Sequence, residues 1–458
     1  MSCSHGHSPQ EMRNVGEEPM KWKNLVFSAG MVMVVSVMLL LSYGVSSGQV
    51  KTPSPVEKRA ADVVGLFREN PGGYEQLFSK SFLAQVPPER LTAIFSYYYS
   101  ICGRCVQLQP VDLSSQVTGK FSFIFEKKVS VPANFTVEAA APNLISGLFL
   151  GNPVSLSTSL DQVIGEFKGL PGVSAFLAAK LTGDKLETVA GYNADRQLAI
   201  GSTFKLYILS ELLRCVNEGE RTWKDVVTLS PDAVSLPTGV LQSWPAGSPL
   251  TLHTCATLMI SQSDNTATDQ LLRLLGREKV ERMLSAAGHS RPELDIPFLS
   301  TMEVFKLKSE QNLSAAYSYL SLPAAKRHTF LADSLMRISR DSLSFRGQPT
   351  LVDSIEWFAS AADLCRVMNW IRLNSESGPG AEVRQILAVN PGLAIPKDKW
   401  KYAGYKGGSE AGVMNMTYLL QSTDGGWYAL SATWNNTQAP LDDSKLVGLV
   451  GGVLQLVK

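Results

Sequence analysis

The chain contains a hydroxyl and an amine at a spacing that suits nucleophilic catalysis, in Ser202-Thr203-Phe204-Lys205. The surrounding residues 198–213 are mostly apolar and predict a buried helix. Positions i and i+3 share a helix face, so the Lys205 amine can reach the Ser202 hydroxyl. A serine is a poor nucleophile until a neighbour takes its proton, and a desolvated lysine can do so. We therefore predict Ser202 as nucleophile and Lys205 as base, at a helix start whose N–H groups face a developing oxyanion.

A second polar segment, Ser263-Asp264-Asn265, separates two predicted helices. The Ser263 hydroxyl could pass a proton to a leaving nitrogen, and the Asn265 amide could hold a substrate amide. A buried Asp264 could brace the turn. Taken alone, this tripeptide is also ordinary helix-capping chemistry.

A third segment, Lys406-Gly407-Gly408-Ser409, lies on a predicted edge strand. Its lysine offers a fixed positive charge for a substrate carboxylate. The two glycines let a ligand lie against the strand as a further strand would. Taken alone, a basic residue beside a flexible β-bulge explains the pattern equally well.

The three motifs together, in this order, resemble those of the penicillin-recognising serine hydrolases, which include class A β-lactamases and D,D-peptidases. The resemblance covers about residues 153–458. A preceding α+β module makes the chain similar to the two-domain β-lactamase-like hydrolases of the clavulanic-acid-cluster type. The resemblance implies a fold in which an antiparallel sheet carries an all-helical subdomain.

The resemblance also implies a role for each motif residue. Ser202 would attack a carbonyl carbon, and Lys205 would take the serine proton. Lys406 would assist Ser263 in protonating the leaving group. The groups that hold the oxyanion or orient the substrate would be the backbone N–H groups of Ser202 and Ser409, the Asn265 amide, and the strand at Gly408 and Ser409.

The chain departs from the family pattern at two places. Gly407 replaces a hydroxyl residue, which removes one donor for a substrate carboxylate, and Ser409 could replace it. In class A β-lactamases a glutamate activates the water that hydrolyses the acyl-enzyme. Glu293, in Pro-Glu-Leu-Asp, is the candidate for that role, although a surface carboxylate explains it too. Without such a base the acyl-enzyme should hydrolyse slowly.

These motifs predict a serine hydrolase that forms an acyl-enzyme and hydrolyses β-lactams or esters. Two alternatives stay open. One is a D,D-peptidase or penicillin-binding protein that acts on cell-wall peptides. The other is a β-lactam-binding or sensor protein that is acylated without turnover.

The amino-acid composition limits the classes of binding partner that we expect. The 458 residues carry 42 basic and 41 acidic side chains, a formal net charge of +1. There is no basic excess for a nucleic acid, so we expect a small-molecule substrate. The five histidines show no zinc spacing, and we expect no metal and no cofactor.

The N-terminal region predicts export. The uncharged run at residues 25–45 follows Lys21 and Lys23 and has about the length that spans a membrane. It predicts a signal anchor, with a cytoplasmic tail at 1–24; a cleaved signal peptide is the alternative. Residues 46–56 resemble a linker. We expect the rest of the chain outside the cytoplasm, membrane-anchored, in the periplasm or at the cell surface.

Beyond the linker the pattern predicts two domains. Residues 57–152 begin helical and then alternate as antiparallel strands, which indicates an accessory α+β domain. Residues 153–458 have strands at both ends and helices between them, which predicts the hydrolase domain. Cys102 and Cys105 would form a local disulfide or stay unpaired, and a bridge between Cys215 and Cys255 is possible.

Overall fold

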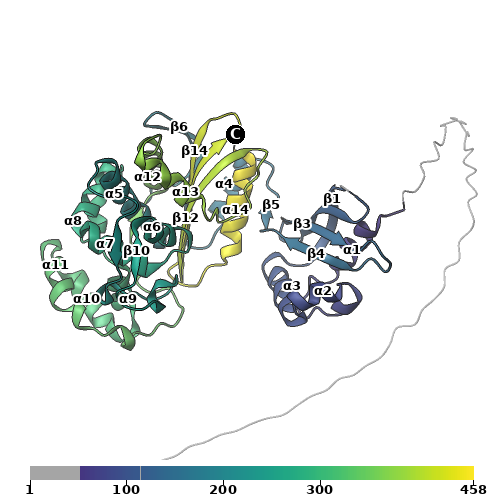
Figure 1. Ribbon diagram of the computed structural model, residues 1–458, viewed down its shortest axis with the longest axis horizontal. Helices are drawn as coiled ribbons and strands as arrows, with labels where there is room; N and C mark the ends of the chain where they lie inside the picture. The colour runs from purple at the N-terminus through teal and green to yellow at the C-terminus, as the bar shows by residue number, and fades with distance from the viewer. Residues whose placement is uncertain (1–51, 114, 458) are drawn as a thin grey trace, which may run out of the picture. The chain divides into compact units, whose positions relative to one another are not determined.

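The computed structural model describes residues 52–113 and 115–457 (Figure 1). The predicted tail and membrane anchor, most of the predicted linker, and Cys3 lie outside the described residues. Within the described ranges, no helix is long and apolar enough to cross a membrane.

The first part of the described chain combines helices with an antiparallel sheet, as the sequence predicts. Its elements are α1 (Pro55–Val64), η1 (Tyr74–Gln76), α2 (Lys80–Gln85), α3 (Pro88–Cys102), β1 (Cys105–Asp112), β2 (Thr118–Phe125), β3 (Val129–Val137) and β4 (Ile145–Leu150). The strands pair in the order β1-β2-β3-β4, and a short strand β5 (Val154–Ser155) also pairs with β3. Alternation along β2 buries Phe121, Phe123 and Phe125 in an aromatic core.

The region from residue 153 onward contains a second antiparallel sheet, built from strands near its start and strands near its end. Its strands are β6 (Val173–Thr182), β7 (Lys185–Tyr192), β12 (Trp400–Glu410), β13 (Val413–Ser422) and β14 (Trp427–Asn435). Their spatial order is β12-β13-β14-β6-β7, so strands from both ends of the region build one sheet. β12 lies at an edge, as the sequence predicts, because only one of its sides pairs with another strand.

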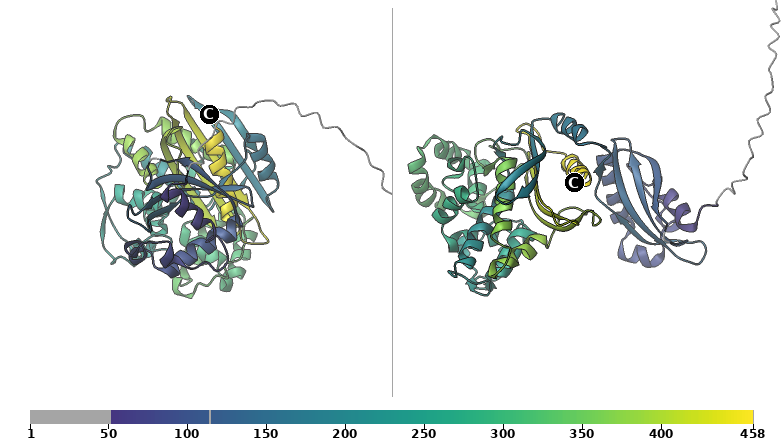
Figure 2. Two further views of the ribbon diagram at one scale, coloured as in Figure 1. Left: turned by 90° about the vertical axis from the view of Figure 1, so that its right-hand side faces the viewer. Right: turned by 90° about the horizontal axis from the view of Figure 1, so that it is seen from above.

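Helices cover both faces of this sheet. One core joins the sheet to α4 (Leu160–Lys168) and α14 (Asp443–Leu456). The other joins the opposite face to α5 (Lys205–Asn217) and α12 (Ala361–Leu373). Seen from above, the curved sheet lies between α14 and the helical region (Figure 2). This arrangement confirms the predicted α+β class.

The helical region contains most of the remaining chain. Its helices are α6 (Leu252–Ser261), α7 (Asn265–Leu275), α8 (Arg277–Ala286), α9 (Thr301–Lys308), α10 (Leu313–Ser321), α11 (Ala324–Asp333) and α13 (Glu382–Ala388). Residues 301–342 form a mostly helical segment that contains α9, α10, α11 and short 3₁₀ turns. Sequence did not predict two short strand pairs, β9 (Val226–Thr228) with β10 (Pro249–Thr251) and β8 (Leu198–Ala199) with β11 (Phe358–Ala359).

The five described cysteines are all free. Cys102 and Cys105 therefore follow the unpaired alternative. The possible bridge between Cys215 and Cys255 is not formed, and burial raises the pKa of both thiols to about 12.

Candidate active site

Ser202 lies at the mouth of the buried helix. β8 leads into the 3₁₀-helix η2 (Gly201–Phe204), and α5 begins directly after it at Lys205. Gly201 makes the turn possible with φ +49°, a left-handed conformation that favours glycine. Ser202 is half-buried while its neighbour Thr203 is fully buried. The hydroxyl thus reaches the surface from a rigid, packed element.

Lys205 is completely buried, with 0% of its surface exposed. Its Nζ lies 2.7 Å from the Ser263 carbonyl oxygen, 3.0 Å from Ser263 Oγ and 2.7 Å from Asn265 Oδ1. Desolvation lowers the pKa of Lys205 well below its usual value, and the charge of Lys406 lowers it further. This amine therefore loses its proton at a lower pH than an exposed lysine does.

Lys205 Nζ donates to each of these three oxygens, so the contacts of the amine are all within the protein. No hydrogen bond joins Ser202 Oγ to Lys205 among the described residues.

The hydroxyl oxygen of Ser263 lies within hydrogen-bond distance of two lysine side chains. Lys406 Nζ lies 3.1 Å from Ser263 Oγ, the same oxygen that Lys205 Nζ contacts. Ser263 has φ +56°, and Asp264 stabilises this turn. The Asp264 carboxylate accepts from the backbone N–H groups of Val240, Leu241 and Ala267 at 2.7, 2.9 and 2.8 Å. The predicted bracing role of Asp264 has a clear structural basis.

The side chain of Lys406 does not carry the permanent positive charge that the sequence predicts. It is 2% exposed, forms no ion pair within the described ranges, and also donates to the Gly407 carbonyl oxygen. Burial lowers the pKa of Lys406 to about 7. Near neutral pH the amine is charged in part of the molecules only, because no carboxylate compensates its desolvation.

Gly408 allows β12, the strand that carries Lys406, to pack closely against the Ser202 segment. A Cβ on Gly408 would lie 2.6 Å from the Ser202 nitrogen and 2.1 Å from the Ile200 carbonyl oxygen. A Cβ on Gly201 would lie 3.0 Å from the Ser409 nitrogen. These close approaches bring β12 against the Ser202 turn, and the backbone nitrogens of Ser202 and Ser409 lie in this region of contact.

The side-chain amide of Asn265 forms hydrogen bonds within the protein. Its amide oxygen accepts from Lys205, and its Nδ2 donates to the Leu236 carbonyl oxygen at 3.1 Å. The side chain is buried, and one hydrogen of its Nδ2 group has no partner among these contacts. In this conformation the Asn265 amide oxygen positions Lys205.

The structure places Glu293 away from the other motif residues. It lies in η5 (Pro292–Asp295), its side chain is 60% exposed, and it pairs with Arg291. The hydrogen bond from Arg291 lowers the pKa of Glu293 below its usual value. No contact in the described ranges joins Glu293 to Ser202 or Lys205. Its expected role as the water-activating base therefore finds no support in this geometry, and the surface alternative fits.

Two asparagines of the sheet hold the nucleophile segment, and the sequence analysis missed both. Thr203 Oγ1 donates to Asn415 Oδ1 at 2.8 Å, and Asn415 lies opposite Gly408 in the β12–β13 register. Asn435 brackets Ala199, accepting from its N–H at 2.8 Å and donating to its carbonyl at 2.9 Å. Buried amides in otherwise apolar strands were the signal that could have identified them.

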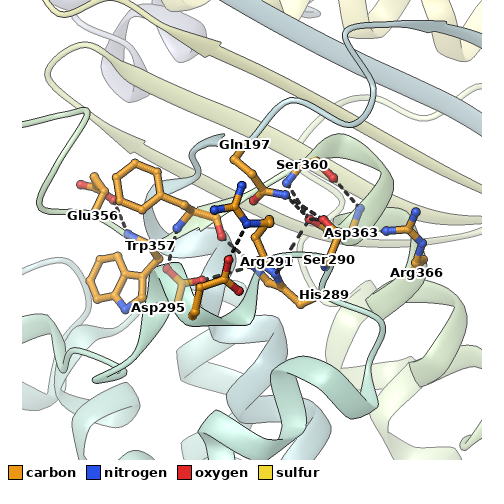
Figure 3. A network of polar contacts seen from close by, with 12 residues as sticks. Gln197, His289, Ser290, Arg291, Asp295, Glu356, Trp357, Ser360, Asp363 and Arg366 are labelled. Atoms are coloured by element: carbon orange, nitrogen blue, oxygen red, sulfur yellow. Dashed lines mark hydrogen bonds and ion pairs between the residues drawn. The ribbon is translucent and has the colours of Figure 1, made fainter. Parts of the chain in front are cut away.

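A buried polar network supports the same segment from the helical side (Figure 3). His289 Nε2 lies 2.7 Å from the Phe358 carbonyl oxygen, and Asp295 Oδ1 accepts from the Phe358 N–H at 2.8 Å. These contacts fix β11, which pairs with β8 just before Ser202. Burial lowers the pKa of His289, but Asp295 at 3.3 Å outweighs it and leaves the pKa raised.

The described residues contain no cluster of His, Cys, Asp or Glu that could hold a metal ion. The chemistry available at this site is that of two amines, two hydroxyls and two nearby backbone N–H groups. Such a set serves nucleophilic attack on a carbonyl and proton transfer to a leaving group.

Comparison with known proteins was made at three levels. Residues 155–326 match the model of the beta-lactamase enzyme family. No curated protein sequence matches the chain. Among solved structures, the chain is similar to a beta-lactamase from Sphaerobacter thermophilus at 20% identity, covering 65% of this chain and 94% of that chain with a TM-score of 0.45.

Two further solved structures show similar values. PBP-A is 18% identical, with 65% of this chain and 94% of that chain covered and a TM-score of 0.45. A beta-lactamase from Chitinophaga pinensis is 14% identical, with 64% and 96% covered and a TM-score of 0.45. Residues 155–326 are thus similar to the beta-lactamase enzyme family, and the matched segment includes Ser202, Lys205 and Ser263.

Proposed function

We propose that this protein is an exported serine hydrolase that forms an acyl-enzyme at Ser202 with a β-lactam or a small ester. One observation carries the proposal. Two buried lysines, Lys205 and Lys406, lie 3.0 and 3.1 Å from the same Ser263 hydroxyl, next to the strand that contacts the Ser202 backbone.

The reaction begins when Ser202 Oγ forms a bond to the substrate carbonyl carbon. Its proton passes to the amine of Lys205, and the carbonyl oxygen becomes an oxyanion near the N–H groups of Ser202 and Ser409. The bond to the leaving nitrogen or oxygen then breaks. Ser263 Oγ gives its proton to that leaving atom and regains one from the protonated lysine beside it. Atoms and charge balance with no cofactor.

The second half of the reaction requires water. Glu293 is exposed and paired with Arg291, so we assign it no role in activating that water. The acyl-enzyme should therefore persist. This observation favours a second candidate function, a D,D-peptidase or penicillin-binding protein on which β-lactams form long-lived adducts. An acylated sensor without turnover would behave alike towards β-lactams.

We propose a location outside the cytoplasm on the uncharged run at residues 25–45.

Intact-protein mass spectrometry tests the proposal. Full-length protein in detergent would be incubated with benzylpenicillin or a short acyl ester, and the mass followed over time. We expect one covalent adduct on wild type and none on Ser202→Ala. Rapid loss of the adduct would favour a β-lactamase, and a persistent adduct a penicillin-binding protein. Identical masses for wild type and Ser202→Ala with both reagents would refute the proposal.

A further inference from the structure

A cluster of three charged side chains joins the helical region to the end of β12. Lys308, the last residue of α9, and Glu356, just before β11, are buried, and Glu410, the last residue of β12, is half-buried. Lys308 Nζ lies 2.6 Å from Glu356 Oε1 and also contacts the Glu410 carboxylate. One amine therefore links three segments of the chain that are far apart in sequence.

Glu356 is connected to the nucleophile through the next residue, Trp357. The second carboxylate oxygen of Glu356 accepts from the Trp357 backbone N–H at 3.3 Å (Figure 3). The Trp357 carbonyl oxygen accepts from the Ile200 N–H at 3.0 Å. The Trp357 ring also stacks on the Phe204 ring, with 3.7 Å between the ring centroids. Trp357 thus contacts the chain on both sides of Ser202.

Glu410 is connected to the nucleophile through the strand that it ends. Gly408, two residues earlier, lies so near the Ser202 nitrogen that a Cβ on it would be 2.6 Å away. The Ser409 nitrogen would lie 3.0 Å from a Cβ on Gly201. A contact that holds Glu410 in place therefore restrains the part of β12 that packs against Ser202.

The charges of the cluster make the amine necessary. Burial, and then the charge of Glu356, raise the pKa of Glu410 above its usual value, while Lys308 counteracts part of this rise. Burial lowers the pKa of Lys308, but the two carboxylates outweigh it and leave that pKa raised. Without the amine, two carboxyl groups would face each other at a largely buried place, where they repel when both are ionised.

We propose that Lys308 is a positioning residue for the acylation step. By holding Glu356 and Glu410 together, it fixes Trp357 and the end of β12, which both contact the residues around Ser202. Lys308 has no polar contact with Ser202 itself among the described residues, so it acts through these two segments. The inference rests on the proposed function, because acylation of Ser202 is the step that it affects.

The test compares Lys308→Met with Lys308→Arg on full-length protein. Adduct formation would be followed by mass spectrometry over a range of concentrations of benzylpenicillin or the short acyl ester, whichever acylates wild type. We expect Lys308→Met to lower the saturated acylation rate about tenfold or more, with little change in the concentration for half-saturation, because a displaced nucleophile slows the chemical step. Lys308→Arg keeps a cation that can pair with carboxylates and should retain more of the rate.

Lys306→Met is the matched control. Lys306 lies on the same helix and is 7% exposed, against 6% for Lys308. Its Nζ donates to the carbonyl oxygens of Leu335 and Met336 at 3.2 and 3.4 Å, within the helical region. Lys306→Met should therefore lower stability and leave the acylation rate unchanged.

A neutral version of the cluster separates positioning from folding. Lys308→Met alone leaves two carboxyl groups without their cation, which is costly for folding. The triple variant Lys308→Met, Glu356→Gln and Glu410→Gln removes the ionic contacts without that cost, and it should also acylate about tenfold or more slowly than wild type. Thermal melts would verify that each variant is folded.

A wild-type saturated rate in the folded triple variant, or an equal loss of rate in Lys306→Met, would overturn the inference alone. The same holds for a wild-type rate in folded Lys308→Met. Failure of wild type to form any adduct with β-lactams or esters would refute the proposed function and, with it, this role of Lys308.

Discussion

The hydrogen bond between Thr203 and Asn415 offers the sharpest test of how the nucleophile is positioned. Thr203→Val keeps the shape of the side chain and removes the hydroxyl that donates to Asn415 Oδ1 at 2.8 Å. Both residues are buried, so water cannot replace the lost donor. Thr417 still donates to the same oxygen at 2.8 Å, so Asn415 keeps one partner.

The cost in stability should be that of one buried hydrogen bond with its acceptor still partly satisfied. We expect the free energy of unfolding to fall by about 1 kcal/mol. The effect on chemistry should be larger, because Thr203 follows the nucleophile directly and its nitrogen lies close to Gly408. A displacement of about 1 Å at a reacting group can lower a rate about 100-fold. We expect acylation to slow by about 10- to 100-fold.

The assay is the rate of adduct formation at saturating and subsaturating benzylpenicillin. The saturated acylation rate should fall, with little change in the concentration for half-saturation. Thr203→Ser keeps the hydroxyl and should acylate nearly as wild type. Thr417→Val removes the other donor to Asn415 and leaves the Thr203 contact, so it should lose stability but little rate. If folded Thr203→Val were acylated at the wild-type rate, this positioning role would be refuted.

Three other predictions follow from the site. Because the pKa of Lys406 falls to about 7 on folding, the unfolded chain binds more protons between about pH 7 and 10, so the free energy of unfolding should rise with pH there. Lys406→Met should flatten that rise in chemical denaturation; an unchanged slope would contradict a desolvated amine. Gly408→Ala should reduce adduct formation at least 100-fold, since its Cβ would lie 2.1 Å from the Ile200 carbonyl oxygen, and wild-type rates would disprove the close approach. Asp264→Ala should lower the free energy of unfolding by about 3 kcal/mol in urea titrations, because three backbone N–H groups, two of them buried, lose their acceptor; a change under 1 kcal/mol would be inconsistent.

Local sequence predicted the elements that position the site. The apolar segment around Ser202 is helical, the strand of Lys406 is an edge strand, and the termini of the region share one sheet. These features follow from periodicity and turn residues, which act over a few positions. The α+β class could therefore be inferred correctly.

Contacts between distant segments could not be inferred in the same way. Asn415 and Asn435 hold the nucleophile segment from strands more than 200 positions away. Lys406 has no acidic partner in the described part of the chain, which only the folded arrangement reveals, and its lowered pKa follows from its burial. Glu293 has a suggestive local sequence, but its chain segment turns the side chain outward to Arg291. The Asn265 amide oxygen accepts a hydrogen bond from Lys205, a contact that the local sequence does not reveal. Tertiary contacts of this kind decide which polar groups stay free.

The most direct test of the central claim is to locate the acyl group. Full-length protein would be treated with benzylpenicillin and digested, and the modified residue identified by tandem mass spectrometry. The converging lysines predict one acyl group, on Ser202, that is absent from Lys205→Met although this variant is folded. A label on another residue, or undiminished labelling of Ser202 in Lys205→Met, would contradict the account.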